Sequence, residues 1–239
     1  MKRNFCIDIG GSAIKYSFIS KEKIQGYCEI KTPKKKQDFL KTILQIIKTN
    51  VNNTDNICIS IASPILSGVV QSPPNLPIED FNFPKFINKK FKNKVYIEND
   101  ARCAALAENK INKHNDFVLL TLGTGVGGAV FLSGKLYKGE GYAGELGHVI
   151  VENDYFENLW KTRINTIRYL SEAIISIQNS LDPKLIIIST RVIKDKKEFL
   201  EKLSSSLNKD KFNKLKPKII FSKIKNPELI GASLLPNMK

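Results

Sequence analysis

Two glycine-rich turns constrain the fold of this chain more than any other feature. Residues 8–12 read Asp-Ile-Gly-Gly-Ser and residues 122–128 read Leu-Gly-Thr-Gly-Val-Gly-Gly, and strand-forming residues flank both segments. This pattern predicts strand, tight turn and strand. Glycine permits positive φ and carries no Cβ that would block a ligand, so bared backbone N–H groups can bind an anion. We expect Ser12 and Thr124 to supply hydroxyl donors.

Neither turn matches a standard nucleotide motif. A P-loop needs Gly-Lys-Ser/Thr at the start of a helix, and the dinucleotide fingerprint needs a helix after its glycines, whereas a strand follows each turn here. One such hairpin alone is usually only a turn. The pair, with a carboxylate-bearing turn between them, predicts a phosphate cradle with a base beside it.

That carboxylate-bearing turn lies within residues 94–108, where a short apolar strand leads directly into an alanine-rich helix. Asp100 sits at the junction. One interpretation is that Asn99 or Asp100 is only a helix N-cap, and capping is favoured when the segment is taken alone. The other is that Asp100 accepts the proton of an attacking hydroxyl while Asn99 holds the substrate, as phosphoryl transfer requires.

The hydrophobic pattern predicts an α/β chain built from two similar blocks. In the first block we expect strands at 4–9, 14–19, 25–31 and 57–62, and a helix at 37–50. In the second we expect strands at 117–122, 126–132, 135–137 and 185–188, and one long helix at 157–181. A C-terminal helix at 227–235 completes the pattern. Repetition of hairpin, helix and strand indicates a duplicated architecture.

Composition describes a soluble globular chain, with 42% hydrophobic and 26% charged residues among 239. No apolar run is long enough to span a membrane, and the first residues leave no room for a signal peptide or a helix-turn-helix before Phe5. Scattered single cysteines are typical of a reducing compartment. We therefore expect a cytoplasmic protein without a membrane partner.

The net charge of +15 comes largely from lysine runs such as 34–36, 89–90 and 194–197. A basic surface can bind nucleic acid, which is the alternative interpretation. These runs lack interleaved aromatic residues, so we expect a solvated surface and no nucleic-acid partner.

Four segments in order carry a family resemblance, namely residues 8–15, 98–101, 122–128 and 144–148. Together they resemble the ROK family of sugar kinases, within the actin-like ATPase superfamily, over residues 8–235. The resemblance implies an α/β, two-lobed actin-like ATPase (ribonuclease H-like) fold with a central cleft. It places residues 1–98 and 226–239 in a small N-terminal lobe and residues 99–225 in a larger C-terminal lobe, shortened relative to the family.

The resemblance also implies roles for individual residues. Asp100 is the implied catalytic base, and Asp8 helps to place Mg²⁺ together with the phosphates. The implied ATP and phosphate site consists of Asp8, Gly10, Gly11, Ser12, Lys15, Gly123, Thr124 and Gly125. The implied sugar site consists of Asn75, Asn99, Asp100, Glu145 and His148.

The physical character of residues 139–148 agrees with the sugar assignment. A glycine-rich loop that carries Glu145 and His148 three residues apart can offer an acceptor and a donor to adjacent sugar hydroxyls. A single loop histidine is more often an ordinary polar residue. Within the motif, we expect His148 to belong to the site.

The chain also departs from the family. Most members follow the Glu-x-Gly-His motif with a cysteine-rich zinc site, whereas the four cysteines here, Cys6, Cys28, Cys58 and Cys103, lie upstream and lack Cys-x-x-Cys spacing. We therefore expect no zinc. Residues 189–191 read Ser-Thr-Arg where members usually place glycines near adenosine, so the chain shows its phosphate site more clearly than an adenine site.

The resemblance therefore predicts an ATP- and Mg²⁺-dependent kinase for the C6 hydroxyl of a hexose, with N-acetylmannosamine or glucose as acceptor. A β-glucoside kinase and a catalytically inactive sugar-binding relative are the alternatives. The expected partners are the sugar and ATP, and a homodimer agrees with the family's habit of dimerising.

Overall fold

The computed structural model describes residues 3–71, 73, 75–212 and 214–238. Contacts between residues divide the chain into two compact units. Unit 1 comprises Met1–Ala107, Glu140–Tyr142 and Lys225–Lys239, and unit 2 comprises Glu108–Gly139 and Ala143–Ile224. The domain boundaries expected from the sequence stay a prediction.

Unit 1 contains a five-stranded sheet in the order β3-β2-β1-β4-β7. The strands are β1 (Asn4–Ile9), β2 (Ala13–Ser20), β3 (Lys23–Lys31), β4 (Asn56–Ile61) and β7 (Val95–Asn99). The first three form an antiparallel meander, and β4 pairs parallel with both β1 and β7. Because parallel strands end at the same edge of a sheet, the turns that follow β1, β4 and β7 lie at one edge of unit 1.

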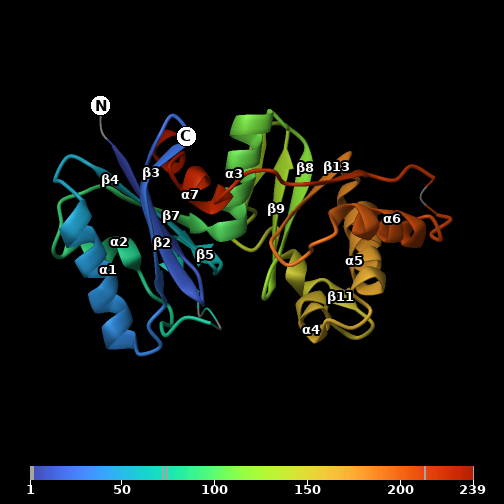
Figure 1. The fold of residues 1–239 in the computed structure, drawn as a ribbon, viewed down its shortest axis with the longest axis horizontal. Helices are drawn as coiled ribbons and strands as arrows, with labels where there is room; N and C mark the ends of the chain where they lie inside the picture. The colour runs from blue at the N-terminus through green and yellow to red at the C-terminus, as the bar shows by residue number, and fades with distance from the viewer. Residues whose placement is uncertain (1–2, 72, 74, 213, 239) are drawn as a thin grey trace. The chain divides into compact units, whose positions relative to one another are not determined.

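The helices of unit 1 bury apolar faces on this sheet. They are α1 (Lys36–Asn50), α2 (Phe83–Asn88), the first two turns of α3 (Asp100–Asn112) and α7 (Pro227–Ala232). In α1 the buried residues Phe39, Ile43 and Ile47 recur every four positions, which is the spacing of one helix face. Gly231 lets α7 pack against α3 backbone to backbone, since a Cβ there would lie 1.6 Å from the carbonyl oxygen of Cys103 (Figure 1).

Unit 2 repeats the sheet arrangement, in the order β10-β9-β8-β13-β14. The strands are β8 (Phe117–Leu122), β9 (Val126–Leu132), β10 (Lys135–Tyr137), β13 (Leu185–Thr190) and β14 (Lys218–Phe221). The helices are α4 (Phe156–Thr162), α5 (Thr166–Leu181) and α6 (Lys196–Leu207), with α5 and α6 beside the sheet and in contact with each other (Figure 1). As in unit 1, a three-stranded meander is followed by two parallel strands. This topology confirms the predicted duplication.

The predicted meanders, the two glycine turns and the strand-to-helix junction at Asp100 are all confirmed. The single helix expected at 157–181 is wrong, because the chain breaks between α4 and α5. Arg163 and Asn165 adopt φ of 61° and 51°, a left-handed conformation that ends one helix before the next begins. The hydrophobic pattern also did not predict α2, α6, β14 and two short hairpins, β5–β6 (Ile65–Leu66, Val69–Val70) and β11–β12 (Ile150–Val151, Asp154–Tyr155).

The thiols of unit 1 fall into two environments. Cys6 and Cys58 face each other across β1 and β4, and both are fully buried, as is Cys103 on α3, whereas Cys28 on β3 is exposed. Burial, followed by the neighbouring thiols, raises the pKa of Cys6 well above its ordinary value. Within the described part of the chain, no helix combines the length and the apolar character needed to cross a bilayer.

Candidate functional site

The first glycine turn is held by side chains that follow β3. The Thr32 hydroxyl donates to the Gly10 carbonyl at 2.6 Å, and the Lys34 ammonium donates to the Gly11 carbonyl at 2.8 Å. A Cβ at Gly11 would lie 2.5 Å from the Cβ of Asn75, so this glycine is required by space. Asn75, the predicted sugar residue, is exposed and packs directly against the turn.

Asp8, at the end of β1, lies at the centre of a buried polar cluster. Its side chain accepts from the Lys15 ammonium at 2.9 Å and from the Ser60 hydroxyl at 3.0 Å. Lys15 stands directly opposite Asp8 in the β1–β2 ladder, and Ser60 stands beside it on β4. The structure therefore assigns Lys15 a clear contact, an ion pair with the carboxylate that the sequence predicts for magnesium.

The Asn99-Asp100 pair follows β7 at the same edge of the sheet. The Asn99 side chain accepts from the Arg102 amide at 3.0 Å and donates to the Ser63 carbonyl at 3.3 Å, so it caps α3. The capping interpretation is thus correct for Asn99, which is buried. Asp100 accepts from the amide of Ala101 at 2.7 Å and is partly accessible.

Three carboxylates gather behind this edge. The buried Cys103 thiol has a pKa raised well above its ordinary value, first by burial and then by the charges of Glu98, Asp100 and Asp8. The predicted base and the predicted magnesium ligand therefore share one electrostatic environment within unit 1.

A buried arginine that the sequence motifs did not mark supports the same region. The Arg102 guanidinium donates to the Glu98 carboxylate at 3.4 Å and to the Gly141 carbonyl at 2.6 Å. Gly141 has φ of 127°, and a Cβ there would lie 2.1 Å from a methyl carbon of Leu66. Arg102 thereby anchors one end of the loop that carries Glu145 and His148.

The remainder of that loop is fixed to β9 in unit 2. A Cβ at Gly144 would lie 3.1 Å from the Cα of Ala129, and one at Gly147 would lie 2.3 Å from the carbonyl oxygen of Val126. Glu145 precedes a short 3₁₀ turn, Leu146–His148, and His148 is exposed with its ring against Tyr155. Gly144 and Gly147 are therefore packed so closely against β9 that a side chain at either position would force a shift.

The second glycine turn is clamped by α4. The indole N–H of Trp160 donates to the Gly123 carbonyl at 3.0 Å, and the Arg163 guanidinium donates to the same oxygen at 2.7 Å. The Glu157 carboxylate accepts from the Val126 amide at 3.0 Å. One short helix therefore fixes both sides of the turn, and the Val126 amide beside the turn is occupied by the Glu157 carboxylate.

Glu157 is the clearest functional candidate that sequence reasoning missed. Burial pushes its pKa up, but hydrogen bonds from Lys161 and from the Val126 amide, with the charges of Lys161 and His148, outweigh burial and leave the pKa below its ordinary 4.5. Because the charge of His148 acts on Glu157, the two side chains lie near each other. The sequence does not mark Glu157 as functional, because acidic residues are common in the first turn of any helix and Glu157 directly follows the apolar residue that begins α4.

The expected reason for glycine in the two turns is partly wrong. The glycines with positive φ lie elsewhere, in the loop at 139–144 and in three surface turns. At Gly11 and Gly125 the available space decides instead. A Cβ at Gly125 would lie 2.7 Å from the Glu157 carboxylate, whereas one at Gly123 would meet nothing within 4 Å. Gly123 therefore faces open space beside the turn.

The structure thus brings the predicted residues together in two groups. Unit 1 holds Asp8, Gly10, Gly11, Ser12, Lys15, Asn75, Asn99 and Asp100, and unit 2 holds Gly123, Thr124, Gly125, Glu145 and His148. Among the described residues, no group of three or more His, Cys, Asp or Glu side chains has the arrangement of a metal site.

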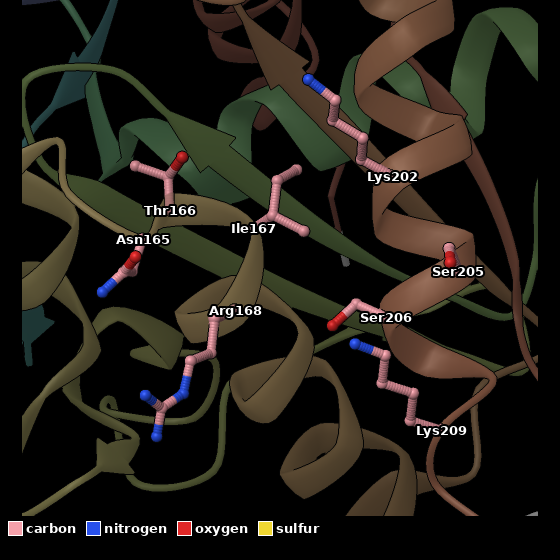
Figure 2. Close-up of a pocket in the computed structure, with 8 residues that line it drawn as sticks. All are labelled: Asn165, Thr166, Ile167, Arg168, Lys202, Ser205, Ser206 and Lys209. Atoms are coloured by element: carbon pink, nitrogen blue, oxygen red, sulfur yellow. The ribbon is translucent and has the colours of Figure 1, made fainter.

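A separate cavity of about 500 Å³ lies between α5 and α6 and contains none of the predicted residues (Figure 2). Its cationic side chains include Arg168 and Lys202. Arg168 is paired with Glu152 and Glu172, and Lys202 is paired with Glu198, all at exposed positions. These surface pairs already neutralise much of the lining charge.

Comparison with known proteins finds a family model and several relatives that match this chain. The model of the ROK family matches residues 4–159. A glucokinase from Thermotoga maritima is 33% identical over 61% of this chain and 50% of its own length. A xylose repressor from Caldicellulosiruptor bescii is 28% identical over 56% of this chain and 37% of its own length. The chain spans between 22% and 56% of the length of the curated relatives considered.

Solved structures share the fold over nearly the whole chain. A ROK family glucokinase from Streptomyces griseus, in complex with glucose and AMPPNP, superposes with a TM-score of 0.83 at 18% identity, covering 99% of this chain and 100% of that one. This likeness confirms the predicted α/β actin-like ATPase fold class.

Proposed function

Because the chain belongs to the ROK family, we propose that it is a sugar kinase that transfers the γ-phosphoryl group of ATP to the C6 hydroxyl of a hexose. N-acetylmannosamine and glucose are the proposed acceptors. Sugar kinases and repressors both occur among its relatives. The support for phosphoryl transfer therefore comes from the arrangement of the residues more than from family membership.

One observation carries the proposal. The parallel strands β1, β4 and β7 end at one edge of unit 1, and their register aligns Asp8, Ser60 and Glu98 in a row across the sheet. The Gly10–Gly11 turn and Asp100 follow these strands at that edge. A phosphate turn and a partly accessible carboxylate at one sheet edge are what in-line transfer to a hydroxyl needs.

In the proposed reaction, Asp100 accepts the proton of the sugar hydroxyl as its oxygen attacks the γ-phosphorus. Asn99 fixes the start of α3 and thereby the direction of Asp100. Lys15 and Ser60 hold Asp8, whose carboxylate suits a hard cation, so that Asp8 and the phosphate oxygens would hold Mg²⁺. When bound, Mg²⁺ supplies positive charge that stabilises the transferring phosphoryl group.

The residues of unit 2 would serve the donor and the sugar. Thr124 and Gly125 present backbone N–H groups to phosphate oxygens, and Glu145 and His148 offer an acceptor and a donor to sugar hydroxyls. Glu157 would hold the Val126 amide in place beside this turn.

The test couples ADP release to absorbance with Mg²⁺-ATP and N-acetylmannosamine, glucose, N-acetylglucosamine or a β-glucoside. We expect sugar-dependent ADP release, and a loss of turnover of about 1,000-fold in Asp100→Asn with KM within a few fold. Asp38→Asn, which removes a carboxylate from the first turn of α1, is the matched control.

Near-normal turnover in Asp100→Asn would refute its role as base. Silence of the wild-type protein across all four sugars, with sugar binding retained, would instead identify a sugar-binding relative that has lost transfer.

A further inference from the structure

Arg163 lies at the second glycine turn. It ends α4 in a left-handed conformation, with φ of 61°, and its guanidinium lies 4.9 Å from the centre of the Trp160 ring. From there it donates to the Gly123 carbonyl at 2.7 Å. The side chain is exposed, so a charged group is held in a defined place at an accessible turn.

The contact with Gly123 is not needed to satisfy that carbonyl. The Trp160 indole already donates to the same oxygen at 3.0 Å. A guanidinium carries five N–H donors in a planar fork, so one bond to a carbonyl leaves others directed elsewhere. The stacked ring restricts the fork and lowers the entropy lost when it binds an anion.

The surroundings leave room for an anion beside Arg163. Gly123 faces open space, with nothing within 4 Å of a Cβ built on it, and the amides of Thr124 and Gly125 follow in the same turn. The other cation on α4, Lys161, is engaged by Glu157. Arg163 is therefore the cation of this helix that is placed to meet phosphate oxygens at the turn.

We propose that Arg163 binds the terminal phosphates of the phosphoryl donor, a nucleoside triphosphate, at the Gly123–Gly125 turn. This inference rests on the proposed kinase function and adds a donor-binding residue to it. Arg163 lies outside every motif that carried the family resemblance and beyond residues 4–159, which the family model matches.

Trp160 makes the experiment direct, because it is the sole tryptophan of the chain and touches the turn. Binding of Mg²⁺-ATP, Mg²⁺-ADP and AMP is measured from Trp160 emission and by calorimetry, at an ionic strength of about 0.15 M to screen distant charge. The variants are Arg163→Met, Arg163→Lys and, as matched control, Arg168→Met, which removes the same charge from the neighbouring helix α5.

We expect Arg163→Met to weaken ATP binding by about 10- to 100-fold while AMP binding changes less than about 2-fold. Arg163→Lys should recover part of the loss, and Arg168→Met should bind ATP as the wild-type protein does. Equal ATP affinities in Arg163→Met and Arg168→Met, or equal losses for ATP and AMP, would overturn the inference while wild-type turnover stayed intact. Absence of ATP binding in the wild-type protein would overturn the proposed function as well.

Discussion

The two glycine turns have similar sequences and share one arrangement, but different parts of the protein hold them. In each turn an exposed cation donates to a glycine carbonyl, Lys34 to Gly11 at 2.8 Å and Arg163 to Gly123 at 2.7 Å. Behind the first turn lies a buried ion pair in the sheet itself, Asp8 with Lys15. Behind the second lies a short helix, α4, which packs against β9.

This difference separates two reasons for glycine. Gly11 is required by the protein, because Asn75 occupies the space that a side chain would need. Gly123 has open space around it, so the protein alone does not require glycine there. The first turn is closely packed at Gly11, whereas the second turn is packed at Gly125, against Glu157, and open at Gly123.

Gly11→Ala should produce the largest change in stability. The new Cβ would lie 2.5 Å from the Cβ of Asn75. Because that carbon is attached directly to the backbone, it cannot move aside as the end of a long side chain could. We expect the free energy of unfolding to fall by about 2 kcal/mol, as for overpacking in a core. Urea denaturation measures this, and the double variant Gly11→Ala with Asn75→Gly should recover most of the loss.

Glu157→Gln should have a smaller, pH-dependent effect. The folded-state pKa of Glu157 lies below its ordinary 4.5, so its contribution is complete above the unfolded pKa and is lost as pH falls through the folded pKa. We therefore expect the variant to melt about 3 °C below the wild-type protein at pH 7, and the difference to shrink below pH 4.5 and to vanish once the pH is below the folded-state pKa.

Glu172→Gln is the matched control for that comparison, since Glu172 pairs with Arg168 at an exposed position. Its effect should be close to zero at both pH values. A gap between Glu157→Gln and the wild-type protein that persisted unchanged in acid would show that the charge of Glu157 does not hold the turn.

Gly123→Ala should change stability least, within about 0.5 kcal/mol of the wild-type protein. Its effect should appear in ligand binding instead, as a rise in the Kd for Mg²⁺-ATP of about 10-fold, because the methyl group enters the space left for phosphate. Calorimetry measures both the stability and the Kd for Mg²⁺-ATP of each variant. A loss of stability like that of Gly11→Ala would remove the distinction between the turns.

The turns and their flanking strands could be predicted because their signals are local. Alternation of apolar residues and paired glycines within ten residues suffice to place β1, β2, β8 and β9. The sequence signal for the strand-to-helix junction at Asp100 is equally local. What followed from the resemblance, the roles of Asp8 and Asp100, stays a prediction that the geometry supports.

The clamp on the second turn could not be predicted, because its contacts join residues more than thirty positions apart. Apolar spacing runs without interruption from Trp160 through Ile164 and Ile167, which favoured one long helix. Nothing in that spacing marks the left-handed residues Arg163 and Asn165. Only the folded chain shows that α4 ends at Thr162 and that Arg163, which caps it, reaches Gly123.

The contrast between exposed and buried thiols has a practical consequence. Because Cys6, Cys58 and Cys103 are buried, a thiol-directed dye should label Cys28 in unit 1 alone. Unit 2 contains the sole tryptophan, Trp160. The natural chain therefore carries a donor and an acceptor position for energy transfer, one in each unit. Changes in the separation of the units on addition of sugar or nucleotide can be followed without a single substitution.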